Sequence, residues 1–140
     1  MGVVNTIEYI TTASTGNYTD FGDLSDVRRY PQGVSSSTRG IFGGGNPGSF
    51  PNVNNEIEYV TIASTGNVTD FGNLTVARAS AGAVSSQLRG VFGGGYSPSV
   101  VNTIDYITIA STGDAADFGD MAASIFYSHG CSDAHGGLST

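Results

Sequence analysis

The amino-acid sequence predicts an all-β fold made of repeated units that each contain four short strands. An internal repeat is the main observation: the block RGIFGGG at residues 39–45 returns as RGVFGGG at residues 89–95, and repeats decide a fold before local signals do. The composition agrees, because the 140 residues include 21 glycines and only 12% are charged, which is typical of strands and tight turns. The apolar runs are also short, rich in β-branched and aromatic residues, and bounded by Gly, Asn and Ser.

The first unit begins with two predicted strands. Residues 6–12 (TIEYITT) are β-branched and aromatic, which favours a strand. Residues 13–17 form a turn that contains Gly and Asn. Residues 19–24 (TDFGDL) form the second strand, and we expect Phe21 and Leu24 to face a core.

A polar crossing and two further strands complete the unit. Pro31 ends the crossing 25–31 and excludes a central strand there. Residues 33–37 (GVSSS) are small, which suits a crowded strand near an axis. Residues 38–42 form the fourth strand, and the glycines 43–45 close it because a tight strand exit favours residues without Cβ.

The same order of elements recurs along the whole chain, which we interpret as a single domain over residues 1–140. The approximate units are 6–54, 55–102 and 103–140. Four short strands per unit of this length are typical of a β-propeller blade, and propellers usually have about 4–8 blades. The positions that recur between units, and that we expect to be structural, are Gly43, Gly44, Gly93, Gly94, Tyr9, Tyr59, Tyr106, Phe21, Phe71 and Phe118.

The run from Arg78 to Met121 resembles a kelch repeat. Gly93 and Gly94 supply the glycine doublet after an apolar strand, Tyr106 follows, and Phe118 stands where that family has Trp. The resemblance covers nearly the whole chain and implies a propeller, without implying an activity, since propellers have many functions. The units also resemble repeat arrays in proteins predicted in marine phages and bacteria.

The two ends of the chain are complementary. Residues 6–24 are strands three and four of a blade, whereas residues 130–140 would be strands one and two. Two copies would therefore make a six-bladed ring, and an open head-to-tail array or a trimer are alternatives. We expect a homo-oligomer that leaves no strand edge exposed.

Charge and composition exclude several classes of partner. The net charge is −7, and the five basic residues are all Arg, so nucleic acid and membrane insertion are not expected. Cys131 is the sole cysteine, so the sequence has no intrachain disulfide. No signal peptide is visible at residues 1–5, and a virion or extracellular protein would reach its location by another route.

The candidate sites for metals and catalysis are weak. The spacing of His129, Cys131, Asp133 and His135 would place these side chains on one face of a strand, where they could bind zinc or, more simply, belong to a divergent terminal unit. The Asp pairs could offer oxygen ligands to calcium, but too few of them; these pairs are Asp20 with Asp23 and Asp117 with Asp120. The Asp-Phe-Gly triplets lack any lysine for phosphate chemistry. We predict neither cofactor nor metal.

Arg39 and Arg89 recur just before an apolar strand and could face a ligand, pair with Glu8, Glu58 or Asp105, or be solvated. The sequence thus predicts a non-enzymatic structural or adhesive protein of an extracellular or virion assembly, such as a phage tail, fibre or capsid-surface component. The alternative is an oligomeric propeller that binds carbohydrate, with surface glycans or other virion proteins as partners. No unique acid, base or nucleophile supports an enzyme.

Overall fold

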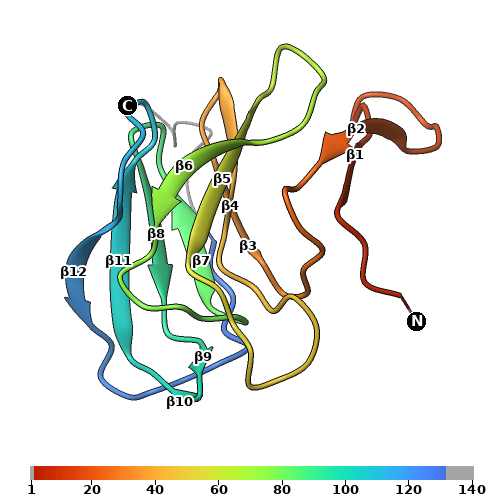
Figure 1. Cartoon of the computed structure of the whole chain (residues 1–140). Coiled ribbons are helices and arrows are strands. Elements are labelled where there is room, and N and C mark those ends of the chain that lie inside the picture. Colours follow the sequence, from red (N-terminus) through yellow and green to blue (C-terminus); the bar gives the residue numbers. More distant parts are fainter. Residues whose placement is uncertain (1, 132–140) are drawn as a thin grey trace.

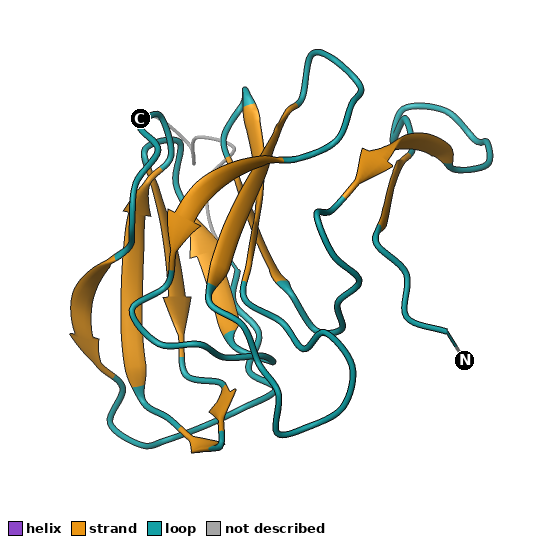
Figure 2. Cartoon of the chain, viewed as in Figure 1, coloured by secondary structure: helices purple, strands orange, loops and turns teal. Residues whose placement is uncertain are grey.

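The computed structural model describes residues 2–131, and within this range the chain is all-β (Figure 2). The predicted all-β class is therefore confirmed. The strands are β1 (Thr6–Tyr9), β2 (Thr19–Asp23), β3 (Gln32–Ser35), β4 (Arg39–Gly43), β5 (Glu56–Thr61), β6 (Thr69–Asn73), β7 (Gly82–Ser85), β8 (Arg89–Gly93), β9 (Tyr96–Ser97), β10 (Ser99–Val100), β11 (Thr103–Thr108) and β12 (Ala116–Asp120).

Two four-stranded antiparallel sheets form the body of the structure. Their strand orders are β3-β4-β5-β6 and β7-β8-β11-β12, while β1 and β2 form a separate hairpin. Each four-stranded sheet takes two strands from one sequence unit and two from the next, as the permuted ends predict. The sheets stand side by side, with β12 and the β1–β2 hairpin at opposite ends of the row (Figure 1). The arrangement is that of a partial propeller whose blades follow the chain.

The strands β3 and β7 are neighbours, as their small residues predict. The backbone N–H of Ser35 donates to the Ser85 hydroxyl at 3.3 Å. A Cβ on Gly90 of β8 would lie 2.6 Å from the Val34 side chain, which is closer than packed carbons approach. The crowded inner position therefore depends on residues with little or no side chain.

The hydrophobic core lies between the sheets. It contains Ile41 and Ile57 from the first blade and Phe92 and Ile107 from the second, all almost fully buried. A Cβ on Gly43 would lie 2.9 Å from the Phe92 ring, so this glycine makes room for the aromatic side chain of the next blade.

The glycine runs close the strands with a left-handed backbone. Gly44 and Gly94 have φ values of 64° and 67°, a region that glycine enters without a steric penalty. A Cβ on Gly44 would lie 2.3 Å from the Arg78 carbonyl oxygen, and one on Gly94 would lie 2.5 Å from that of Ile125. The crossing into the third blade therefore approaches the preceding glycines as closely as the crossing into the second blade does.

The outer hairpin of each blade has one recurring irregularity. In the pairs β1–β2, β5–β6 and β11–β12, the register shifts between the same two positions, which are Ile7/Glu8, Ile57/Glu58 and Ile104/Asp105. A bulge of this kind increases the local twist. The segment after Gly95 contains the short β9–β10 hairpin.

Candidate functional site: paired charges and two unfinished edges

The second blade contains a buried ion pair between Arg78 and Asp105. Neither side chain has exposed area, and Arg78 Nη2 lies 2.6 Å from Asp105 Oδ2. The backbone N–H and the hydroxyl of Thr75 also donate to the two carboxylate oxygens, at 3.1 and 2.5 Å. Burial lowers the pKa of the Arg78 guanidinium, and the Asp105 carboxylate opposes that change. The pair joins the crossing before β7 to the middle of β11, which is a structural role.

The first blade has the same arrangement with a looser geometry. Arg28 Nη2 lies 2.9 Å from Glu56 Oε2 and 3.0 Å from Glu58 Oε2, but only the Glu56 contact is an aligned hydrogen bond. In the third unit the corresponding residue is Ile125. The recurrence of Arg28 as Arg78 was visible in the sequence and could have indicated these pairs.

Of the roles that the sequence left open for Arg39 and Arg89, pairing with Glu58 or Asp105 is not the one found, because Arg28 and Arg78 pair with these carboxylates. Arg39 instead lies over the Tyr59 ring at 4.4 Å, and Arg89 lies over the Tyr106 ring at 4.8 Å. Such contacts are cation–π interactions. Arg39 also donates to the Ile109 carbonyl at 2.8 Å, which links the two blades.

The recurring tyrosines and phenylalanines meet edge to face. The ring centroids of Tyr9 and Phe21, Tyr59 and Phe71, and Tyr106 and Phe118 are 5.9, 6.0 and 5.9 Å apart. In the two complete blades an arginine covers the tyrosine as well. These tyrosines therefore have less free ring surface for a sugar than the sequence alone indicates.

A loop of each blade docks on the outermost strand of the preceding blade; we call this the loop-on-strand contact. In the first example Gly66 N–H donates to the Phe21 carbonyl at 2.7 Å, and Val68 N–H donates to that of Asp23 at 3.0 Å. The Asn67 side chain accepts from Asp23 N–H at 3.0 Å. Sequence reasoning missed this role of Asn67, for which the signal was an Asx residue at the same place in every unit.

The second loop-on-strand contact repeats the first almost atom for atom. Gly113 and Ala115 donate to the carbonyls of Phe71 and Asn73 at 2.7 and 2.8 Å, and the Asp114 carboxylate accepts from Asn73 N–H at 2.9 Å. The backbones meet over a glycine in both cases. A Cβ on Gly22 would lie 2.2 Å from Gly66 O, and one on Gly72 would lie 2.4 Å from Gly113 O.

The loop-on-strand contact is incomplete at both ends of the row of sheets: one end has the strand β12, and the other end has the β1–β2 loop. On β12, Phe118 is 56% exposed, whereas its counterpart Phe71 is 2% exposed. No atom within 4 Å would meet a Cβ on Gly119. At the other end, the β1–β2 loop presents Tyr18 with 68% of its surface exposed. Within residues 2–131, neither half has the partner that the internal copies have.

Two of the four candidate zinc ligands, His129 and Cys131, lie within the described residues. Among the described residues, no group of three or more His, Cys, Asp or Glu could hold a metal ion. His129 and Cys131 are exposed, and Asp133 and His135 lie outside the described residues. Of the Asp pairs, the Asp117 carboxylate accepts from Gly119 N–H at 3.2 Å, which is an ordinary turn contact.

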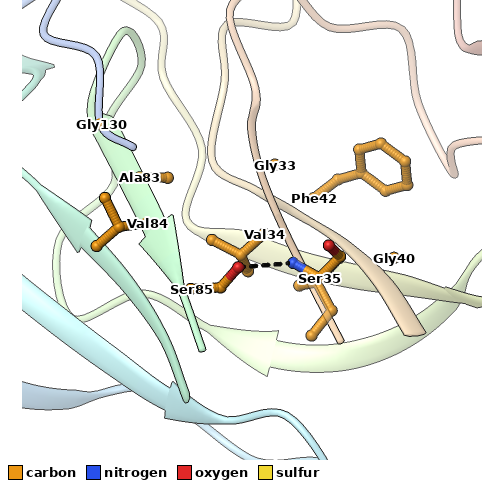
Figure 3. A pocket seen from close by; sticks show the side chains of 10 residues that line it. Gly33, Val34, Ser35, Gly40, Phe42, Ala83, Val84, Ser85 and Gly130 are labelled. Carbon is orange, nitrogen blue, oxygen red and sulfur yellow. Dashed lines mark hydrogen bonds between the residues drawn. The ribbon is translucent and has the colours of Figure 1, made fainter. Parts of the chain in front are cut away.

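A cavity of about 400 Å³ lies along β3 and β7 and reaches Gly130, where the third blade begins (Figure 3). Its polar side chains are the hydroxyls of Ser35 and Ser85, and Ser85 already accepts a hydrogen bond from Ser35 N–H. None of the described residues that line it is ionisable. The cavity therefore offers shape and hydroxyl groups but no acid or base for catalysis.

Comparison with models of protein families and with curated proteins found no match, so the kelch resemblance stays a prediction. None of the described residues belongs to a helix long and apolar enough to cross a membrane.

Proposed function

We propose that this chain is a non-enzymatic structural or adhesive protein of an extracellular or virion assembly, such as a tail, fibre or capsid-surface component. The observation that carries the proposal is the pair of complementary unfinished edges at β12 and at the β1–β2 loop. A protein that exposes both halves of its own internal contact has the surfaces needed to build a larger object.

The use of the buried charges supports a structural role. Arg28, Arg78, Glu58 and Asp105 are the buried charged side chains of the described residues, and all four are in ion pairs between chain segments. The cavity along β3 and β7 is lined, among the described residues, by side chains that have no ionisable group. Catalysis by general acid and base needs such groups within reach of a substrate.

The experiment that tests the proposal is immunogold electron microscopy with an antibody against the chain. The samples are particles and secreted material purified from the source of the protein, together with a soluble cell extract. Label on particles or on extracellular fibres is the expected result. Label confined to the soluble extract, in a sample where particles are present, would contradict the proposal.

A specific observation favours carbohydrate binding as a second candidate. Five aromatic side chains gather near the crossings into β3 and into the third blade, and we call them the aromatic cluster. Successive ring centroids lie 4.6–6.2 Å apart, and four of the rings are 43–55% exposed. The cluster consists of Tyr30, Phe50, Tyr96, Phe126 and Tyr127.

The backbone explains how the cluster forms. Tyr30, Ser80 and Tyr127 occupy one repeat position and have φ values of 57°, 58° and 54°. Ser80 N–H donates to the Tyr30 carbonyl at 3.3 Å, and Tyr127 N–H donates to that of Ser80 at 2.9 Å. Exposed apolar patches mark interaction sites more often than chance.

A glycan array compares the natural chain with Tyr127→Ser to test this second function. Retention of selected glycans that the variant loses, with an unchanged melting temperature, supports a sugar site at the cluster. An array without binding discards the candidate.

A further inference from the structure

We propose that the partner at the unfinished edge is a second copy of this 140-residue chain, and that two copies close into a six-bladed dimer. The inference rests on the proposed function and names its partner. The β1–β2 loop of each copy docks on β12 of the other. The two internal loop-on-strand contacts provide the template, because they fix which atoms meet.

The template assigns the contacts at β12. Gly16 and Tyr18 of the second copy take the places of Gly113 and Ala115 and donate to the Phe118 and Asp120 carbonyls. Asn17 of the second copy takes the place of Asn67 and Asp114, whose side-chain oxygens accept from the backbone N–H of the strand. Gly119 has the open space that the approaching backbone needs.

The β1 side of the hairpin is unfinished too. In the first blade β4 covers β5, and Val60 is 7% exposed, whereas its counterpart Ile10 next to β1 is 48% exposed. Glu58 is buried, and its counterpart Glu8 is exposed. The hairpin thus has one apolar edge for a strand of the partner and one loop for β12 of the partner.

The chain enters the third blade at a position where the hairpin of a second copy can pair with it. Gly95 N–H donates to the Ile125 carbonyl at 2.7 Å, as Gly45 N–H donates to that of Arg78 at 2.9 Å. A Cβ on Gly130 would lie 2.2 Å from the Val84 side chain, so the chain at this point is tight against β7. The second copy's hairpin supplies outer strands to the blade that starts here.

The number of copies follows from the number of blades. One copy contributes two complete blades, the outer hairpin of one and the start of another, which together amount to three. Rings usually have about 4–8 blades, so two copies give an allowed ring, whereas one copy gives too few and three give too many. A two-fold ring also covers both edges of both copies.

One residue makes the junction weaker than the internal contacts. Arg28 and Arg78 pair with the acid of the neighbouring strand, but the third unit has Ile125 at this position. Glu8 of the second copy therefore meets no arginine. Replacing Ile125, which is 43% exposed, with Arg restores the pattern of the other blades without disturbing the core.

The experiment is sedimentation equilibrium of the 140-residue chain over a wide concentration series. The natural chain is expected at twice its mass of 14.3 kDa. Phe118→Ser removes an aromatic ring that is 56% exposed in a single copy and that the dimer covers. The loss is about 50-fold per junction from the buried area, and about 2,500-fold overall because the closed dimer has two junctions.

The matched control is Leu88→Ser, which makes the same type of change at a side chain 72% exposed in the β7–β8 turn, and it leaves the dimer unchanged. Ile125→Arg is expected to tighten the dimer at least about tenfold, as a paired buried charge does. Glu8→Gln in the same chain cancels that gain. Circular dichroism checks that each variant is folded.

Three results would overturn the inference. The first is a folded natural chain that stays monomeric at every concentration, which would show that the partner site does not exist. The second is a dimer that Phe118→Ser leaves intact, which would show that the copies meet elsewhere. Mass that grows without limit would refute the closed dimer and leave the proposed structural role in place. Failure of the immunogold test beside a confirmed dimer would reject the proposed function alone.

Discussion

Replacing Asp105 with Asn tests how strongly the buried ion pair holds the second blade. The substitution keeps the shape of the side chain and removes its charge, so the fully buried Arg78 guanidinium loses its counter-ion. The Thr75 hydroxyl can rotate to accept from the new amide, which limits the damage to the charge itself. Breaking a buried pair by removing one partner costs about 3–5 kcal/mol.

We expect Asp105→Asn to lower the free energy of unfolding by about 3–4 kcal/mol. Urea unfolding followed by circular dichroism measures this change, and a decrease in melting temperature of about 10–15 °C accompanies it for a chain of this size. The midpoint should fall without a change in slope, because the surface exposed on unfolding is the same.

The matched control is Glu58→Gln in the first blade. Arg28 keeps the aligned hydrogen bond with Glu56, whose side chain is 49% exposed, so the expected cost is about 1 kcal/mol. The difference between the two variants is the informative quantity. If both lose the same stability to within about 1 kcal/mol, the reasoning from alignment and burial is wrong.

Five further substitutions test the contacts between blades by urea unfolding. Gly72→Ala should lower the free energy of unfolding by about 3–4 kcal/mol, because its Cβ would meet Gly113. Gly119→Ala in the monomer has only backbone strain and should cost about 1 kcal/mol. Equal costs would contradict the loop-on-strand contact. Gly43→Ala should cost about 1–3 kcal/mol from the Phe92 ring, and a neutral result would mean that the ring moves aside. Arg39→Ala should cost about 1–2 kcal/mol and Arg89→Ala less than about 1 kcal/mol, since Arg39 also donates a hydrogen bond to the Ile109 carbonyl of the next blade.

The sequence predicted the class of fold well because the repeat is exact where the geometry is strict. Three kinds of position recur: the glycines after β4 and β8, the small residues of β3 and β7, and Phe71. A larger side chain at the glycines or the small residues, or a smaller ring at Phe71, would disturb a neighbour. Positions within strands were predicted to within a few residues. β1 is shorter than expected, since no strand of the described residues pairs with its far edge.

The site was harder to predict because its parts come from different blades. Arg78 lies in a crossing and Asp105 in β11, and no local pattern says that they meet. The sequence left the role of Arg39 and Arg89 open between a ligand, a carboxylate and solvent, and their contacts with Tyr59 and Tyr106 were not among these roles. The recurrence of Arg28 and Arg78 was the better guide.

The offset between sequence units and sheets changes where the molecule could be divided. A cut near residue 54, at the boundary of two sequence units, would separate β4 from β5 and leave two halves of one sheet. A cut within the crossing 75–81 would fall between complete sheets. Each folded sheet is therefore built from parts of two successive sequence repeats. The hydrogen-bonded ladders between β4 and β5 and between β8 and β11 join these repeats, so neither repeat can unfold alone.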